Sequence, residues 1–249
     1  NWANIWLNEG FATYLSRKYR EYKFGYGEGE YIRYGEILSF FSSDKRWHRS
    51  TVTHNYYEPI DLFDGHVYAK GSLILTMMCE YLGESSFWRS IQNYTADNKY
   101  KNVETADLKK AIEETTGENL DWFFDQWLHR PGFPDFDVEW SYNQRNRAVQ
   151  LSVMQLQENL FKLPVEIRID NEKHTLWVEK KDAVYEIKVS KRPKMVIFNT
   201  GMIVPCKMNM KKSNSDWIYQ LQNAPHILDK INAINVLKKK KGRRIVERA

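Results

Sequence analysis

Cysteine is scarce in this sequence and long hydrophobic runs are missing, which argues against a disulfide-rich scaffold and a helical membrane protein. The 249 residues include only Cys79 and Cys206, which have neither the spacing of a metal site nor an evident reason to form a disulfide. No apolar run approaches the ~20 residues that a membrane-spanning helix requires. We therefore expect two unpaired, buried thiols and no membrane span.

Positive and negative residues are nearly balanced, and an excess of positive charge is found only at the C-terminal end. The formal net charge is +5, and most of it comes from Lys238 to Lys241 together with Arg243, Arg244 and Arg248. A basic run of this kind can bind nucleic acid or acidic membranes, and it is also typical of a solvated helix end. We favour the solvated end and expect no nucleic-acid partner.

An initiating methionine is missing, and the chain opens with Asn1 and Trp2 inside a helical pattern. We expect the natural N-terminus to lie upstream, so the sequence identifies neither a signal peptide nor a compartment. Hydrophobic residues make up 42% of the chain and aromatic residues 14%, which indicates a folded protein with aromatic-rich cores.

Apolar residues recur at helical spacing through the first half of the chain. A Gly- and Tyr-rich stretch at 24–34 and a polar stretch at 42–64 interrupt this pattern and predict a break and a loop. The segment 69–82 is apolar on almost every side, which predicts a buried helix. The predicted helices cover residues 2–20, 31–41, 69–82, 86–96, 105–116 and 120–129.

After Pro134 the apolar spacing changes to every second residue, the pattern of a half-buried strand. Several such stretches, separated by turn candidates, predict a small antiparallel β-sandwich over 134–205. Residues 206–215 are predicted to form a polar linker, and helical spacing returns from Asp216. The predicted fold class is therefore α+β with more than one domain.

Glu9 is the first candidate functional residue, because a helix over 2–20 places it on a largely apolar face. An unpaired buried charge costs several kcal/mol, so this carboxylate must reach solvent or find a partner. Arg17, a lysine elsewhere or a zinc ion would each be a suitable partner for the Glu9 carboxylate. Spacing alone favours a solvated or ion-paired side chain.

The residues around Glu9 resemble a known family. The segment 2–14, Trp-Ala-Asn-Ile-Trp-Leu-Asn-Glu-Gly-Phe-Ala-Thr-Tyr, is similar to the part of zinc aminopeptidases of the aminopeptidase N and leukotriene hydrolase type that supplies the third zinc ligand. In these gluzincin metallopeptidases a helix with the motif His-Glu-x-x-His supplies two histidines, and a glutamate on the next helix completes the set. The resemblance implies that Glu9 is a metal ligand.

The His-Glu-x-x-His motif itself is missing, and no two of the six histidines are four positions apart. The family's spacing places the second histidine about ten residues before Asn1. A catalytic zinc needs three protein ligands and an open position. The resemblance therefore implies one Zn²⁺ ion in a longer parent protein, and an inactive fragment without zinc here.

Tyr68 is the second candidate. It lies in the segment 63–72, Phe-Asp-Gly-His-Val-Tyr-Ala-Lys-Gly-Ser, and a tyrosine at the start of an apolar helix usually packs with its hydroxyl at the surface. The same segment resembles the part of the family whose tyrosine faces the zinc-bound substrate. The resemblance implies that Tyr68 is catalytic, its hydroxyl stabilising the oxyanion formed when zinc-activated water attacks the peptide carbonyl.

The polar neighbours of Tyr68 are interpreted as structural. We expect Asp64 to cap or brace the turn before the helix. Lys70 is expected to support the fold through its aliphatic stem and a surface or carbonyl contact. His66 is interpreted as a polar loop residue rather than a proton shuttle.

The resemblance extends over most of the chain. Residues 1–133 resemble the C-terminal helical lobe of a thermolysin-like catalytic domain, 134–205 a β-sandwich, and 206–249 a linker with the first helices of a C-terminal helical repeat array. It implies a parent hydrolase that removes N-terminal residues from its peptide substrates. A non-catalytic scaffold or protein-interaction module of the same fold is the alternative.

A catalytic domain cut before residue 1 leaves apolar faces without their partners. We therefore expect exposed apolar surface near Trp2, Trp6 and Tyr68, and self-association that covers it. Neither the preferred N-terminal residue nor the oligomeric state of the parent follows from the sequence.

Overall fold

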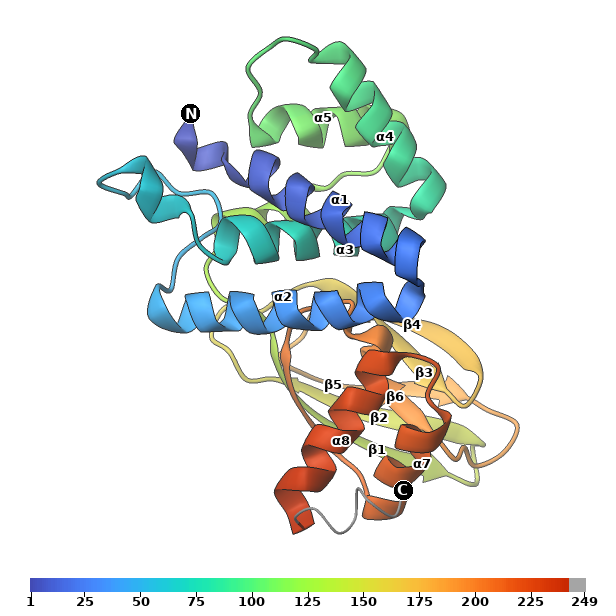
Figure 1. Cartoon of the computed structure of the whole chain (residues 1–249). Coiled ribbons are helices and arrows are strands. Elements are labelled where there is room, and N and C mark those ends of the chain that lie inside the picture. Colours follow the sequence, from blue (N-terminus) through green and yellow to red (C-terminus); the bar gives the residue numbers. More distant parts are fainter. Residues whose placement is uncertain (242–249) are drawn as a thin grey trace. The chain divides into compact units, whose positions relative to one another are not determined.

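Two sets of elements follow the change of apolar spacing along the chain: helices first, then strands with two closing helices. The computed structural model describes residues 1–241. It divides into two units, Asn1–Gly132 and Phe133–Ala249, each described here by itself (Figure 1). The part of the basic tail in residues 242–249 lies outside the described residues.

The first unit is helical. Short 3-10 turns at Trp2–Asn4 and Pro59–Leu62 and π-helical turns at His66–Lys70 and Asp125–His129 flank its helices. The helices are α1 (Trp6–Phe24), α2 (Tyr26–Arg46), α3 (Gly71–Leu82), α4 (Glu84–Asp97), α5 (Thr105–Thr116) and α6 (Asp121–Phe124).

The predicted break over 24–34 is wrong, because only Gly25 interrupts the helical pattern there. Gly25 has φ of 97°, a conformation that suits glycine and turns the chain between α1 and α2. Helix α2 then begins at Tyr26 and runs through Arg46, into the stretch predicted to be a loop. Glycines and tyrosines lower helix propensity, but the burial of one face of α2 outweighs that local preference.

Helix α3 forms the centre of the helical unit, as its apolar composition predicts. Leu73, Ile74 and Leu75 are fully buried. Because successive side chains point to different sides of a helix, α3 is covered by other elements on most of its sides. Helix α1 lies alongside α3 and also contacts α2. The predicted buried helix is thus confirmed, although its first residues form a π-helical turn rather than an α-helix.

The expectation of exposed apolar surface is correct for Trp2 and wrong for Trp6. Trp2 is 48% exposed, whereas Trp6 is fully buried. The indole Nε1 of Trp6 donates to Thr105 Oγ1 at 2.8 Å, so the start of α5 covers this side chain. Tyr68 is half-buried. Self-association stays a prediction.

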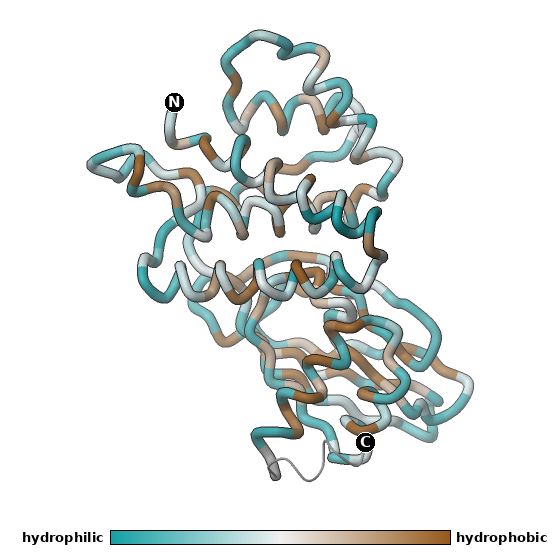
Figure 2. The backbone as a smooth tube through the Cα atoms, in the orientation of Figure 1, coloured by the Kyte–Doolittle hydropathy of each residue, from teal (hydrophilic) through white to brown (hydrophobic). Residues whose placement is uncertain are grey.

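The second unit carries two small sheets, ordered β5-β2-β1-β7 and β4-β3-β6. Hydrophobic and hydrophilic residues are interspersed in this unit in Figure 2, and every second position of β3 is buried. The strands are β1 (Asp135–Asn143), β2 (Ala148–Gln155), β3 (Leu163–Ile169), β4 (Glu172–Val178), β5 (Asp182–Lys188), β6 (Val196–Phe198) and β7 (Lys207–Lys211).

The first sheet departs from the prediction in two ways. Strand β7 lies within the stretch 206–215 that was predicted to be a linker. It pairs with β1 in parallel, from Asp135 opposite Lys207 to Glu139 opposite Lys211, so the sheet is mixed rather than purely antiparallel. The other pairs, β1 with β2, β2 with β5, and β3 with both its neighbours, are antiparallel.

The two sheets meet through aromatic side chains. Phe136 on β1 and Phe198 on β6 are both fully buried, and their ring centres lie 5.4 Å apart in an edge-to-face arrangement. Helices α7 (Asn214–Asn223) and α8 (Ile227–Lys241) lie side by side in the same unit. The buried Asp229 on α8 accepts from Thr200 Oγ1 at 2.7 Å and ties α8 to the turn after β6.

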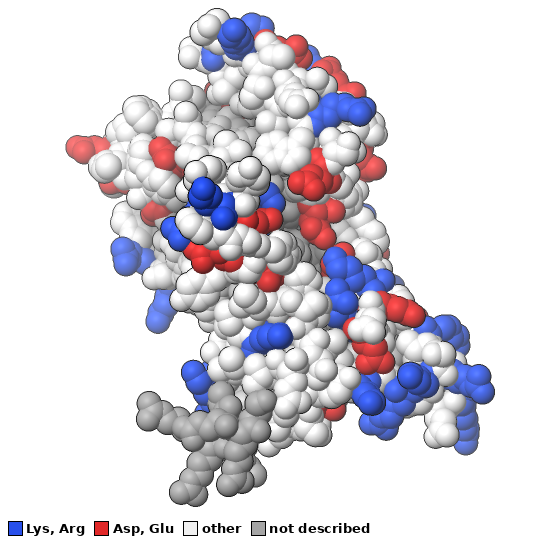
Figure 3. Space-filling view, turned by 45° about the vertical axis from the view of Figure 1, so that its right-hand side comes forward, with Lys and Arg blue, Asp and Glu red and all other residues white. Residues whose placement is uncertain are grey.

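Three remaining expectations concern thiols, membrane spans and charge. Cys79 and Cys206 are unpaired as predicted, but both are half-buried rather than fully buried. Among residues 1–241 no helix is long and apolar enough to cross a bilayer. In the view of Figure 3, Lys and Arg side chains gather over the strand-bearing unit. The division into catalytic lobe, sandwich and repeat array stays a prediction.

Candidate active site

Glu9 lies near the start of α1, where this helix crosses the beginning of α3. The crossing is tight, because a Cβ atom added to Gly10 would lie 2.9 Å from the Cα atom of Gly71. Only glycine at both positions permits this approach of the two backbones. The half-buried Glu9, next to Gly10 in the chain, is therefore brought against the residues that precede Gly71.

Tyr68 belongs to those preceding residues. It sits in the π-helical turn His66–Lys70, which is closed by a bond from the Lys70 N–H to the Gly65 carbonyl oxygen at 2.8 Å. Turns of this kind are rare and recur at functional sites. The ring of Tyr68 lies 6.2 Å from that of Phe63, which in turn lies 6.2 Å from the ring of Trp2.

The structure brings the two predicted site residues together. Burial, the charge of Glu9 and a hydrogen bond to its carboxylate all raise the pKa of the Tyr68 hydroxyl above its usual value. At neutral pH this phenol therefore keeps its proton and can act as a hydrogen-bond donor. The cleft thus has a carboxylate group and a hydroxyl donor in its wall.

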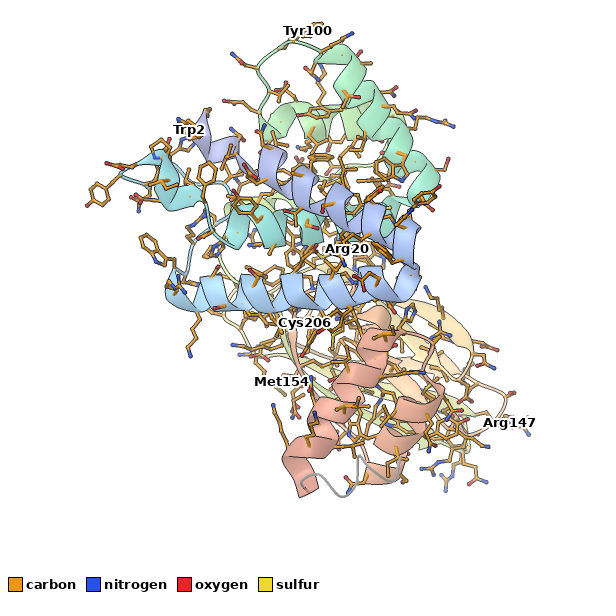
Figure 4. The ribbon with its side chains drawn as sticks, viewed as in Figure 1. Trp2, Arg20, Tyr100, Arg147, Met154 and Cys206 are labelled. Carbon is orange, nitrogen blue, oxygen red and sulfur yellow. The ribbon has the colours of Figure 1, made fainter. Side chains whose placement is uncertain are left out.

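Glu9 and Tyr68 open into a cleft of about 350 Å³ that runs along α1. The α1 residues in its wall recur every three or four positions, so one face of the helix forms that wall. Figure 4 labels Arg20 on this helix, which pairs with Glu28, and Trp2 just before its start. The cleft is lined by Glu9, Ala12, Thr13, Ser16, Arg17, Arg20, Ile32, Glu36 and Tyr68.

A buried ionic network behind the cleft was not found from the sequence. Arg17 is buried and its Nε donates to Glu36 at 3.2 Å, so Arg17 pairs with α2 and not with Glu9. Glu36 also accepts from Ser72 at 3.0 Å, and Arg17 donates to the hydroxyl of Thr76. Burial is the largest influence on Glu36 and raises its pKa, against the opposing effect of Arg17. The network links α1, α2 and α3 beneath the cleft.

Two of the three polar neighbours of Tyr68 differ from expectation. Asp64 braces the turn as predicted, because its Oδ1 accepts from the His66 N–H at 2.8 Å. His66 is fully buried and is not a loop residue at the surface. Lys70 is also fully buried, and its amine finds no hydrogen-bond partner in the part of the chain that the structure describes. The predicted surface or carbonyl contact of Lys70 is therefore wrong.

The residues present can supply one of the protein ligands of a zinc site. Glu9 offers a carboxylate oxygen at the edge of an open cleft, which is a suitable single ligand. Across residues 1–241 there is no group of three His, Cys, Asp or Glu side chains able to hold a metal ion. A complete catalytic site requires three protein ligands, so the described residues alone do not form one.

The chain is similar to known proteins in both sequence and structure. The family model described as the peptidase family M1 domain matches residues 1–127. A leucyl aminopeptidase from Saccharolobus solfataricus is 28% identical over 94% of this chain, and the alanine/arginine aminopeptidase of Saccharomyces cerevisiae is 29% identical over 75%. A probable aminopeptidase 1 from Saccharolobus solfataricus is 29% identical over 80%.

A solved structure shares the fold. The crystal structure of Legionella pneumophila aminopeptidase A in complex with aspartic acid matches 97% of this chain with a TM-score of 0.79, at 19% sequence identity. The match covers 29% of that chain, and the three relatives named above are covered over 30%, 23% and 26% of their lengths. The chain therefore spans less than a third of the length of each of these four proteins.

Proposed function

The chain belongs to peptidase family M1, and we propose that it comprises the C-terminal part of the catalytic domain of a zinc-dependent aminopeptidase together with the domains downstream of it. The proposed domains are the helical lobe 1–133, the β-sandwich 134–205 and the first helices of a C-terminal array at 206–249. Its relatives carry names that describe aminopeptidases, which supports a peptidase whose substrates are peptides.

The placement of Glu9 and Tyr68 in one cleft carries this proposal. These residues are 59 positions apart in the sequence, yet the crossing of α1 and α3 sets them in one cleft. We assign Glu9 as the one zinc ligand that this chain supplies. When bound, zinc supplies Lewis-acid chemistry that polarises a peptide carbonyl.

Tyr68 has the complementary role in the proposal. A tyrosine hydroxyl carries its proton at neutral pH, so Tyr68 can donate to the carbonyl oxygen as negative charge develops there. A donor placed in advance stabilises that charge more than the ground state and so raises kcat. The chain alone brings one ligand where three are needed, so we expect it to bind no catalytic zinc and to be inactive.

The test replaces Tyr68 by phenylalanine in the longer parent protein. Loss of one such donor lowers kcat for an aminoacyl-4-nitroanilide about 100- to 1000-fold, with little change in KM. Tyr100→Phe is the matched control, because Tyr100 is 94% exposed and lies outside the cleft. Equal activity of the two variants would contradict the role of Tyr68.

The same assay distinguishes a non-catalytic scaffold from an aminopeptidase. A folded parent that hydrolyses no aminoacyl or peptide substrate and binds no zinc would indicate a non-catalytic member of family M1. Wild-type hydrolysis that disappears with chelation and returns with added zinc would support the aminopeptidase.

A further inference from the structure

We propose that His66 is a positioning residue for Tyr68: held between the carboxylates of Asp44 and Asp64, it fixes the turn that presents Tyr68 to the Glu9 cleft. The catalytic consequence rests on the proposed function, whereas the structural consequence rests only on contacts within the helical unit.

Both ring nitrogens of His66 face carboxylate oxygens. Nδ1 lies 3.0 Å from Asp64 Oδ2 and Nε2 lies 3.4 Å from Asp44 Oδ1, while the ring itself is fully buried. A carboxylate oxygen only accepts, so each contact is a hydrogen bond when the ring nitrogen that faces the carboxylate carries a proton. The Phe40 ring meets the imidazole edge-to-face at 5.7 Å and fixes its plane.

Each carboxylate has a further anchor. Arg49 donates to Asp64 Oδ1 at 2.7 Å and to the Leu62 carbonyl at 3.1 Å. The His48 ring nitrogen Nδ1 lies 3.1 Å from Asp44 Oδ2. These contacts hold both acceptors in place before the imidazole meets them, and charge-assisted hydrogen bonds of this kind are the stronger class.

The charges of Asp44 and Asp64 agree with this arrangement. Burial alone would raise the pKa of each carboxyl group, but hydrogen bonds from His66 to both, and from His48 to Asp44, hold both pKa values below their usual range. Both groups are therefore ionised at neutral pH, and His66 joins two anions that belong to different elements.

His66 is therefore one link from the turn to α2. Asp44 belongs to α2, and Asp64 lies just before the turn. A second tie supports the same junction, because the Gly65 N–H donates to Ser43 Oγ at 3.0 Å. Of these two ties, only His66 lies inside the π-helical turn that contains Tyr68.

The link matters because a π-helical turn holds one more residue than an α-helical turn. Its closing bond joins Lys70 to Gly65, and an unrestrained segment relaxes toward the regular i to i−4 pattern. If the turn changed to the α-helical pattern, it would contain one residue fewer. The side chains that precede the turn would then rotate by about 100° relative to those that follow it. Tyr68 would then leave its position beside Glu9.

The test is a double-mutant cycle in the longer parent protein. His66→Phe keeps a planar ring against Phe40 and removes both polar contacts. We expect it to lower kcat about tenfold or more when Tyr68 is present and less than about twofold in a Tyr68→Phe background, with KM changed little. His66→Gln, which keeps one donor, should recover part of the loss. Equal losses in both backgrounds would overturn the positioning role.

Amide hydrogen exchange provides a readout that needs no activity. In His66→Phe the Tyr68 and Lys70 amides should exchange about tenfold faster or more, whereas the Leu75 amide in α3 keeps its rate. Unchanged exchange at Tyr68 and Lys70 would overturn the proposal. If the wild type hydrolyses nothing, the proposed function fails and the exchange rates still decide the structural role.

Asp44→Asn serves as the second variant if His66→Phe does not fold. It keeps the size of the side chain, weakens the Nε2 contact and leaves the turn residues unaltered. Faster exchange of the Tyr68 amide in this variant supports the positioning role of His66. Exchange at the wild-type rate contradicts it.

Discussion

Replacing Lys70 by methionine is expected to stabilise the helical unit, by an amount that depends on pH. Lys70 is fully buried, and burial lowers its pKa from the ordinary 10.5 to about 7, despite the opposing influence of Asp44. Methionine has a similar length, and its sulfur suits the neighbouring Phe40 ring, which lies 5.1 Å from the lysine amine.

The magnitude is set by the two pKa values. The unfolded chain takes up the proton as the pH falls through 10.5, whereas the folded chain resists it until about pH 7. The lysine therefore destabilises the fold increasingly between these values, by about 2 kcal/mol at pH 9 and about 4 kcal/mol at pH 7. Below pH 7 the penalty stays constant.

Urea unfolding followed by circular dichroism at pH 7 and pH 9 measures this difference. The gain in unfolding free energy of Lys70→Met should be about 2 kcal/mol larger at pH 7 than at pH 9. Lys110→Met is the matched control, since the Lys110 side chain is 73% exposed, and its effect should be small at both pH values. A Lys70→Met variant that is less stable than wild type at pH 7, or a gain independent of pH, would refute the reasoning.

Two further predictions concern the packing beneath the cleft. Gly10→Ala should lower the unfolding free energy by more than about 2 kcal/mol, because its Cβ would meet the Gly71 backbone. Gly35→Ala, in open space on α2, should be neutral or slightly stabilising, and thermal unfolding compares the two. Arg17→Met should cost about 3–5 kcal/mol by leaving the buried Glu36 unpaired, and adding Glu36→Gln should recover most of that loss. Additive losses in this cycle would show that the pair does not interact.

Local patterns allowed several elements to be predicted well. The helix predicted over 105–116 has the bounds of α5, because the polar residues before it and Gly117 after it mark both ends. Strands β1, β2, β3 and β5 have the alternation of apolar residues that predicted a β-sandwich after Pro134. Strand β6 was missed, since its three residues Val196–Phe198 are all buried and show no alternation.

The elements that were missed depend on distant partners. Strand β7 has the polar sequence Lys-Met-Asn-Met-Lys and becomes a strand by pairing with β1, about seventy positions earlier in the chain. The π-helical turn at Tyr68 was not predicted, and both His66 within it and Gly65 before it contact α2 through residues 22 positions earlier in the chain.

The site was predictable in part for a similar reason. Glu9 and Tyr68 were proposed as candidates from the sequence segments around them, and neither their spacing nor the composition indicated that they line one cleft. Arg17 and Glu36 lie on two different helices, and each looks like an ordinary solvated charge in the sequence. Their pairing results from the crossing of α1, α2 and α3, which a local pattern does not encode.

Zinc content and hydrolysis, measured together on the longer parent protein with Glu9→Gln, test the proposed function most directly. Glu21→Gln is the control, because Glu21 lies on the same helix, pairs with Lys18 and is outside the cleft. We predict about one zinc per wild-type chain, with zinc affinity and hydrolysis both lost in Glu9→Gln and both kept in Glu21→Gln. A Glu9→Gln parent that retains zinc and full activity would contradict the assignment of Glu9.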